Sequence, residues 1–376
     1  MDTAIKFLYL SEPDMIKVGA TDMAACVDTM EDMFRLLSEG DYQMGGKNGN
    51  SHGIWMGFPD NPKFPNMPKN GPDRRFTAMP AYLGGKFDMA GVKWYGSNVE
   101  NREKGLPRSI LMLVLNDKDT GAPKAFMSAN LISSYRTGAV PGVGAKNLAR
   151  KDASTVGIIG PGVMNKTAME AFMVTCPNIC RVKIKGRGKK SLDSFVDFLK
   201  EKFPRITDIQ IVDTMEDAVR ECDIVSMAMP CAMGSASYPY IKEEWIKPGA
   251  LLCLPGSSRF DEDFMRERAK LVTDNVHLYE SWQDEFPAPA YESAGIICTK
   301  WCDMVLDHTL DPKKIENIGD ILTGKVPGRK DDDEIIIFSI GGMPVEDVAW
   351  GTVLYENALK KGVGTMLPLW DSPYLA

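Results

Sequence analysis

The sequence predicts an α/β protein with a doubly wound, Rossmann-type parallel sheet and a second domain of α+β type. From residue 154, strand-like apolar runs alternate with helical patterns, which is typical of a parallel sheet with crossover helices. Residues 75–128 instead hold short strand-like pieces separated by Gly, Asp and Thr turns, which indicates a mostly antiparallel sheet. A chain of 376 residues is long for a single core, so two domains are expected.

The elements of the amino-terminal half follow from local pattern. Residues 22–39 place apolar side chains at helical spacing and predict an amphipathic helix. Residues 40–74 are rich in Gly, Pro and Asn and predict a long loop. After the sheet pieces of residues 75–128, a helix is expected through residues 129–149.

The alternating half predicts helices over residues 164–175, 190–202 and 215–221, each between strand-like runs. After residue 310 the pattern closes with a strand in EIIIFSIGG and a helix in PVEDVAWGTVLYENALKKG. The pair Lys360–Lys361 followed by Gly362 is a suitable carboxyl end for that helix.

Composition excludes several classes of protein. A net charge of -7 argues against a nucleic-acid-binding surface, which needs clustered Lys and Arg. The amino terminus lacks a basic signal-peptide region, and no apolar run approaches the ~18 residues of a membrane span. The lack of such a run predicts no membrane partner. Eight scattered cysteines and three histidines favour a reducing cytoplasm and no metal site.

A glycine loop at residues 156–172, VGIIGPGVMNKTAMEAF, predicts a dinucleotide site. Gly160 permits a tight turn after the strand, and Gly162 lets the backbone approach a pyrophosphate at the helix amino terminus. Gly160, Gly162, Val163 and Met164 are therefore candidate cofactor-binding residues. Asn165 replaces the third glycine of the usual fingerprint, so a purely structural strand-to-helix turn is the alternative.

The next strand bears on which dinucleotide is bound. An NAD site normally has Asp or Glu at the end of that strand, for the ribose 2'-hydroxyl. Here the strand ends in KIKG and continues as RGKK, so Arg187 and Lys189 are candidate donors to a 2'-phosphate. NADP is favoured, with NAD possible if the loop is only a solvated basic segment.

Three cations lie in apolar or glycine-rich contexts of the first domain: Arg75, Lys93 and Arg136. They come from separate elements, and converging cations bind a carboxylate well, Arg as a bidentate fork. The alternative is that each one faces solvent.

These stretches also resemble one known family. RRFTAMPAYL, GVKWYGSN, the segment from GLPRSILM to SSYRTGA, VGIIGPGV and IIIFSIGGMPVEDVAW are similar, in this order, to the ornithine cyclodeaminase/mu-crystallin family. The resemblance runs from about residue 75 to 364 and leaves residues 40–74 as an insertion that the family pattern does not explain.

The resemblance implies a homodimer with a Rossmann domain over residues 131–319. Residues 1–130 and 320–376 would form the substrate-binding and dimerisation domain, with the insertion at 40–74. The family uses a nicotinamide cofactor on amino acids, keto acids or imines. Its carboxylate-binding cations match Arg75, Lys93 and Arg136, the last two as catalytic residues with Lys93 a proton donor. Further matches are Met79 in the pocket, and Ser339 and Gly341 in the turn near the nicotinamide.

One departure bears on the reaction. Cyclodeaminases carry an Asp in the glycine turn after the fifth nucleotide-domain strand, where this chain has Ser257 and Ser258 and, shifted, Asp261. Without that carboxylate the ring closure lacks its base, which favours amino-acid dehydrogenase or ketimine reductase chemistry. A cyclodeaminase, with Asp261 in the missing role, and a non-catalytic NADPH- and ligand-binding protein are the alternatives.

Overall fold

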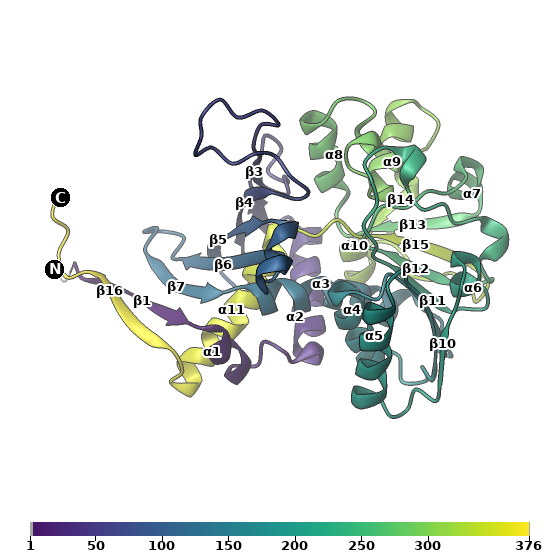
Figure 1. Cartoon of the computed structure of the whole chain (residues 1–376), viewed down its shortest axis with the longest axis horizontal. Coiled ribbons are helices and arrows are strands. Elements are labelled where there is room, and N and C mark those ends of the chain that lie inside the picture. The colour runs from purple at the N-terminus through teal and green to yellow at the C-terminus, as the bar shows by residue number, and fades with distance from the viewer. Residues whose placement is uncertain (1–2, 376) are drawn as a thin grey trace. The chain divides into compact units, whose positions relative to one another are not determined.

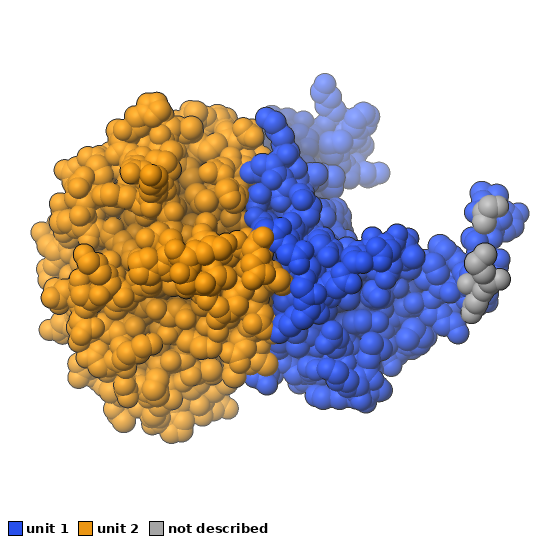
Figure 2. Space-filling model, turned by 180° about the vertical axis from the view of Figure 1, so that it is seen from behind, with its two compact units in different colours: residues 1–22, 40–136, 343–376 blue, residues 23–39, 137–342 orange. Residues whose placement is uncertain are grey.

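The computed structural model describes residues 3–375, which form two compact units, coloured separately in Figure 2. Unit 1 takes in the residues up to Asp22, Gly40–Arg136 and the residues from Met343 onward. Unit 2 comprises Met23–Glu39 and Thr137–Gly342. Each unit has its own sheet, so each is described by itself (Figure 1).

The sheet of unit 1 has the strand order β16-β1-β7-β6-β5-β4-β2, and β3 also pairs with β4. Its neighbours are antiparallel apart from the parallel pair of β1 and β7. The strands are β1 (Ile5–Leu10), β2 (Tyr42–Met44), β3 (Ile54–Met56), β4 (Arg75–Leu83), β5 (Met89–Ser97), β6 (Ser109–Asn116), β7 (Pro123–Ser128) and β16 (Thr365–Trp370). This confirms the antiparallel sheet predicted for residues 75–128.

One face of this sheet is covered by α11 (Pro344–Lys361), which contacts β4, β5 and β6. Every second side chain of β4 and β5 is turned inward, as the period of a half-buried strand requires. The helix lies close to the sheet, because a Cβ on Gly351 would approach Leu113 to 2.3 Å. Unit 1 also holds α1 (Glu12–Lys17), η1 (Val99–Lys104) and the first part of α3 (Asn130–Leu148).

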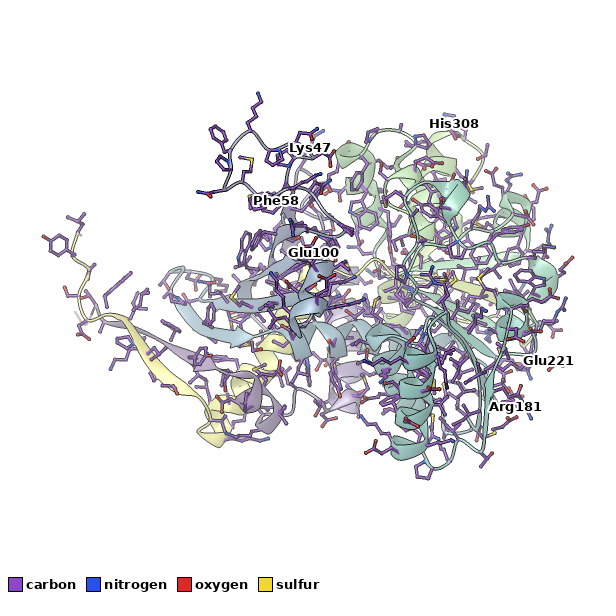
Figure 3. The ribbon with its side chains drawn as sticks, in the orientation of Figure 1. Lys47, Phe58, Glu100, Arg181, Glu221 and His308 are labelled. Carbon is purple, nitrogen blue, oxygen red and sulfur yellow. The ribbon has the colours of Figure 1, made fainter. Side chains whose placement is uncertain are left out.

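The segment of residues 40–74 differs from the loop that was expected. It adds β2 and β3 to the edge of the sheet at β4, and a longer excursion carries Phe58 (Figure 3). Phe58 packs edge-on against Phe76 with ring centroids 6.4 Å apart. The pairing with β4 gives the Gly- and Pro-rich segment its local order.

Unit 2 contains a parallel sheet in the order β10-β9-β8-β11-β12-β15-β13-β14. The strands are β8 (Thr155–Ile159), β9 (Arg181–Lys185), β10 (Asp208–Ile211), β11 (Ile224–Met227), β12 (Leu251–Leu254), β13 (Ala269–Thr273), β14 (Ile315–Asn317) and β15 (Ile335–Ser339). The fold class predicted from the alternating pattern is confirmed.

The helices of unit 2 include those predicted over residues 22–39, 164–175, 190–202 and 215–221. They are α2 (Met23–Glu39), α4 (Val163–Thr175), α5 (Lys189–Lys202), α6 (Met215–Val219), α7 (Glu262–Glu267), α8 (Val276–Glu285), α9 (Ile297–Leu306), α10 (Ile318–Leu322), the rest of α3 and the short turns η2 (Ser235–Ser237), η3 (Glu243–Trp245), η4 (Ala290–Glu292) and η5 (Pro312–Lys314). Within residues 3–375, no helix has the length and apolar character needed to cross a membrane.

The unit boundaries differ from the expected domain boundaries at three places. Helix α2 belongs to unit 2, because its apolar face packs against α4 and α10. Residues 320–342 also belong to unit 2, because β15 pairs with β12 and β13 inside the parallel sheet. Inside α3, residues 131–136 belong to unit 1.

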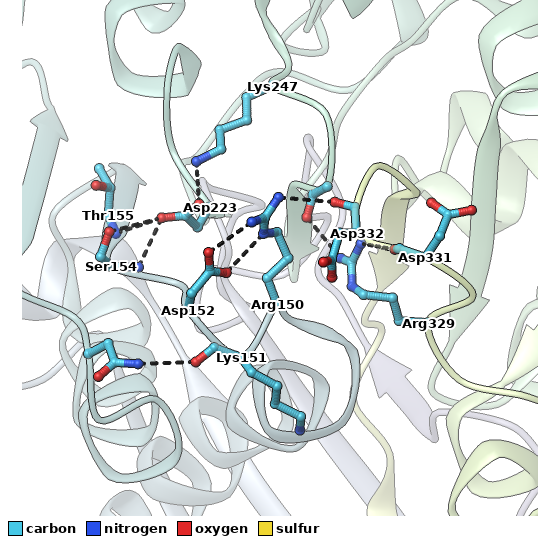
Figure 4. Close-up of polar contacts among 12 residues, drawn as sticks. Arg150, Lys151, Asp152, Ser154, Thr155, Asp223, Lys247, Arg329, Asp331 and Asp332 are labelled. Atoms are coloured by element: carbon cyan, nitrogen blue, oxygen red, sulfur yellow. Dashed lines mark hydrogen bonds and ion pairs between the residues drawn. The ribbon is translucent and has the colours of Figure 1, made fainter.

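The amino ends of two central strands of unit 2 are joined by one carboxylate, Asp223 (Figure 4). Its Oδ2 accepts hydrogen bonds from the backbone nitrogens of Ser154 and Thr155, at 2.9 and 3.0 Å, and Lys247 forms an ion pair with its Oδ1. Burial alone would raise the pKa of Asp223, but these hydrogen bonds outweigh it and hold the pKa below its ordinary value. The opposite, carboxyl ends of the strands carry the loops in which α/β sheets bind ligands.

Candidate functional site

Four charged side chains form a buried charge cluster in unit 1: Lys93, Arg136, Glu346 and Asp347. Lys93 Nζ donates to Asp347 Oδ2 at 2.6 Å. Arg136 Nε donates to Asp347 Oδ1 at 3.2 Å, and its Nη1 donates to Glu346 Oε2 at 2.6 Å. No side chain in this cluster is more than 7% exposed. Asp347 therefore bridges the two cations, with one oxygen on each.

The start of α11 places both acids of this cluster. The helix begins with Pro344, and Glu346 and Asp347 fall in its first turn, where a negative charge interacts favourably with the helix dipole. Glu346 Oε1 also accepts a hydrogen bond from the Met343 backbone nitrogen at 2.9 Å. Glu346 thus caps its own helix, and the two carboxylates together pair with Lys93 and Arg136.

The two cations of the cluster differ in how firmly they hold their protons. Burial, and then the neighbouring charge of Arg136, lower the pKa of Lys93 to about 8, although Asp347 acts against this shift. Burial also disfavours the charged form of Arg136, but Asp347 and Glu346 outweigh it and raise the pKa of Arg136. Near neutral pH, Lys93 can exchange a proton while Arg136 remains a fixed cation.

The sheet face around Lys93 brings further predicted residues together. Met79 pairs with Lys93 across β4 and β5 and is buried, and the ring centroid of Tyr95 lies 5.6 Å from Lys93 Nζ. Thr77 lies one step further along the same face, and its buried Oγ1 has no hydrogen-bond partner among the described residues. Arg75 lies two steps from Met79 on this face and forms an ion pair with Asp73.

The predicted glycine loop of unit 2 joins β8 to α4. Gly160 has φ +90°, and a Cβ there would lie 2.4 Å from the Ala228 carbonyl oxygen, so the turn requires glycine. Gly162 is the N-cap of α4, and a Cβ there would meet nothing within 4 Å. Val163 and Met164, in the first turn of α4, are exposed. An open helix amino terminus of this kind fits a pyrophosphate.

Asn165, at the position of the missing third glycine, holds this loop by hydrogen bonds. Its Nδ2 donates to the carbonyls of Ile159 and Gly160, at 3.1 and 2.8 Å. Its Oδ1 accepts from Ser226 Oγ, on the neighbouring strand β11, at 2.7 Å. Asn165, which replaces the third glycine of the fingerprint, therefore fixes the loop to the sheet through its buried side-chain amide.

The basic residues after β9 are solvent-facing. Arg187 is exposed, and Lys189 Nζ lies 3.0 Å from Asp193 Oδ2 within α5. Strand β9 ends at Lys185, and the turn that follows it contains Gly186 and Gly188. No carboxylate stands at the end of this strand, as the sequence indicates.

The family model for "Ornithine cyclodeaminase/mu-crystallin family" matches residues 20–362. The chain belongs to this family. Among its members, the N-((2S)-2-amino-2-carboxyethyl)-L-glutamate dehydrogenase of Staphylococcus aureus is 27% identical over 372 residues, covering 97% of this chain and 99% of that one. The alanine dehydrogenase of Archaeoglobus fulgidus is 33% identical over 295 residues, covering 77% and 82% of the two chains.

Solved structures of the ornithine cyclodeaminase/mu-crystallin type share this fold over nearly the whole chain. An archaeal alanine dehydrogenase dimer with bound NAD matches with a TM-score of 0.75 and 28% identity, covering 97% of this chain and 100% of that one. The Δ1-pyrroline-2-carboxylate reductase of Thermococcus litoralis, in complex with NADH and L-proline, matches with a TM-score of 0.75 and 26% identity, covering 96% and 99%.

The family's predicted nicotinamide turn reveals a residue that the sequence reasoning missed, Asp274. Ser339 ends β15 and its Oγ accepts from the Cys298 backbone nitrogen at 3.1 Å. Asp274 Oδ2 accepts from the backbone nitrogens of Gly341 and Gly342, at 2.7 and 3.1 Å. Burial raises the pKa of Asp274 although these hydrogen bonds oppose it. A usable signal was present, because Asp274 directly follows β13, at the carboxyl end of a parallel strand.

Asp261, weighed as a substitute for the missing cyclodeaminase Asp, is hydrogen-bonded to Tyr240. Both of its carboxylate oxygens lie 2.7 Å from the hydroxyl of Tyr240, which donates to them. Ser258 is fully buried, and its Oγ has no hydrogen-bond partner among the described residues. Across residues 3–375, no group of three His, Cys, Asp or Glu is arranged to hold a metal ion.

Proposed function

We propose that this protein is a nicotinamide-dinucleotide-dependent oxidoreductase that acts on the C–N bond of an amino acid or imine. The observation that carries the proposal is the buried charge cluster, in which Lys93 is neutralised by Asp347 and has a pKa of about 8. A general acid or base works best when its pKa lies near the working pH. The names of the relatives, dehydrogenases and reductases of amino acids and imines, support the same chemistry.

In the proposed reaction, unit 1 binds the substrate and unit 2 binds the cofactor. A bound nicotinamide supplies the chemistry of hydride exchange at the substrate carbon. In the direction of imine reduction, Lys93 Nζ gives its proton to the imine nitrogen, and in oxidation it accepts a proton from the amine. Arg136 holds Asp347 in place, and Asp347 orients the Lys93 ammonium. Arg75 holds the substrate carboxylate, and Met79 lines the pocket beside Lys93.

The cofactor assigned to unit 2 is NADP in preference to NAD. The open amino terminus of α4 at Gly162 fits the pyrophosphate, and the turn of Gly341 with Ser339 lies at the carboxyl end of β15, where a nicotinamide ring would bind. The absence of a carboxylate at the end of β9 and the exposed Arg187 and Lys189 support a 2'-phosphate there. The solved relatives hold NAD or NADH, so NAD is the alternative.

A titration with NADPH and NADH tests this preference. Replacing Arg187 and Lys189 by Ala removes two charged donors, so NADPH affinity is expected to fall about tenfold or more while NADH affinity stays unchanged. Lys200→Ala, an exposed lysine at the far end of α5, is the matched control. Equal losses for both dinucleotides would contradict the 2'-phosphate assignment.

A homodimer and a cytoplasmic location, both expected from the sequence, are part of this proposal. The sheet face of unit 1 turned away from α11 exposes Phe76, Trp94 and Ile110. Phe76 and Trp94 stack with centroids 5.6 Å apart. Contiguous exposed apolar side chains are typical of association surfaces, and a second copy of this chain is the proposed partner.

The decisive experiment is a substrate screen that follows nicotinamide absorbance, with amino acids in one direction and mixtures of keto acids and amines in the other. Lys93→Met is expected to lower kcat at least about 100-fold. Lys118→Met, an exposed lysine of the same unit, is the control. Release of ammonia from ornithine without net oxidation or reduction of the cofactor would instead indicate a cyclodeaminase. Cofactor binding without any turnover would indicate a ligand-binding protein.

A further inference from the structure

Asp73, at the end of the 40–74 segment, forms ion pairs with two arginines of unit 1. Its Oδ1 pairs with Nη1 of Arg75, and its Oδ2 lies 3.2 Å from Nε of Arg108. Arg75 and Arg108, called here the arginine pair, thus share a single carboxylate. Guanidinium groups bind carboxylates as forks, so two of them around one carboxylate form a clamp.

The surroundings of the arginine pair carry an excess of positive charge. The nearby Glu100, labelled in Figure 3, is engaged by Arg74. Partial burial, and then the charges of Arg75 and of Arg102, lower the pKa of Arg108. Like-charge repulsion of this kind favours an anion at the pair, and Asp73 is the carboxylate that the chain itself provides.

Arg75, one member of the arginine pair, stands on the sheet face that carries Lys93. Arg75 pairs with Ser97, and Ser97 pairs with Ser109, the residue after Arg108. The hydroxyls of Ser97 and Ser109 are 2.6 Å apart. Arg75 lies four residues from Met79, the partner of Lys93, which is about 13 Å along the strand. Thr77, whose hydroxyl has no hydrogen-bond partner in the described part of the chain, lies between Arg75 and Met79.

The backbone of Asp73 explains how the carboxylate reaches this place. Asp73 has φ +54°, a left-handed conformation that Asp and Asn adopt more readily than other non-glycine residues. This turn comes two residues before β4 begins at Arg75, so the side chain folds back onto the strand it precedes. The contact of Asp73 with Arg75 is local, and Asp73 takes no part in the strand pairing of the sheet.

We propose that Asp73 is an internal carboxylate that occupies the arginine pair and gives way to the carboxylate of the substrate. The class of substrate rests on the proposed function, whereas the competition between Asp73 and an external carboxylate for the arginine pair does not. A site occupied internally for nine-tenths of the time binds an external ligand about tenfold more weakly than an open one. Asp73 and Arg108 would therefore set the selectivity for carboxylates at this end of the site.

The test measures binding without turnover, by calorimetry with pyrrole-2-carboxylate, a planar carboxylate that the enzyme cannot reduce. Asp73→Asn keeps a residue that tolerates the left-handed turn and removes the charge. We expect it to tighten binding about tenfold. Asp73→Gly, which also suits this φ, should do the same. Asp60→Asn, a neutralised acid elsewhere in the 40–74 segment, should leave binding unchanged.

Two further measurements separate competition from a purely structural role. Pyrrole-2-carboxamide, which has no charge, should bind equally to the natural protein and to Asp73→Asn. Arg108→Met should weaken carboxylate binding and abolish the gain from Asp73→Asn in the double variant. Weaker or unchanged carboxylate binding by Asp73→Asn overturns the proposal, as does an absence of binding in every variant. Because no hydride transfer is measured, these outcomes are independent of the substrate screen.

Discussion

Replacing Asp347 by Asn gives the sharpest test of the role proposed for Lys93. The carboxylate lies 2.6 Å from Lys93 Nζ and supports its charged form, against burial and Arg136, to leave the pKa at about 8. Removing an opposite charge at such a distance lowers a lysine pKa by about 1–3 units. With a loss of about 1.5 units, the protonated share of Lys93 at pH 7 falls from about 90% to about 25%.

The assay is the pH profile of kcat/KM for imine reduction, the direction in which Lys93 must be protonated. The natural protein should lose activity as pH rises through about 8, and Asp347→Asn should lose it at least one unit lower. The titration of the substrate is common to both proteins, so the difference between them reports on Lys93. Asp347→Glu retains the charge and is the matched control, and thermal melts verify folding. An identical break in both profiles would refute the reasoning.

Three other outcomes are expected. Asn165→Ala leaves the loop carbonyls of unit 2 without their buried donor, so the free energy of unfolding in urea should fall by about 1–3 kcal/mol. Dinucleotide affinity should fall as well, and unchanged stability would count against the role of Asn165 in the loop. The carboxylate of Asp223, whose pKa is lowered in the fold, stabilises the protein above its unfolded pKa, near 4. That contribution is lost as pH falls through the lower pKa that Asp223 has in the folded protein. Asp223→Asn should therefore lose less unfolding free energy at acid pH than the natural protein in urea unfolding, and an equal loss would contradict this. Trp94→Glu, on the exposed sheet face, should convert a dimer to a monomer in light scattering, and an unchanged mass would exclude that face as the interface.

The local elements could be predicted because their signals are local. The start of α4 at Val163 follows from two glycines after an apolar strand, and the end of α11 follows from two lysines before Gly362. Strand β16 escaped prediction, because it contains a proline and exists through its pairing with β1. The position of β15 inside the parallel sheet is a tertiary fact that periodicity does not encode.

The candidate site could be predicted in its cations but not in its acids. Lys93 and Arg136 stood out because each interrupts an apolar or glycine-rich stretch. Glu346 and Asp347 look like ordinary first-turn acids, and they meet Arg136 and, for Asp347, Lys93 across more than 200 residues of chain. Asp73 lies in a segment that was expected to be a loop, and its contact with Arg75 depends on one left-handed residue. Ion pairs that depend on tertiary packing or on a single backbone dihedral angle cannot be predicted from composition or local pattern.

The pairing of β1 with β16 fixes an order of events during synthesis. Unit 2 needs no residue beyond Gly342, whereas the sheet and covering helix of unit 1 need strands from both ends of the chain. We therefore expect unit 2 to fold on the ribosome while unit 1 waits, which pulse proteolysis of stalled chains can check through early protection of residues 137–342. Until Glu346 and Asp347 have emerged, Lys93 and Arg136 are an uncompensated pair of cations. A chain that ends before α11 would therefore have a complete parallel sheet in unit 2 and an incomplete, aggregation-prone unit 1.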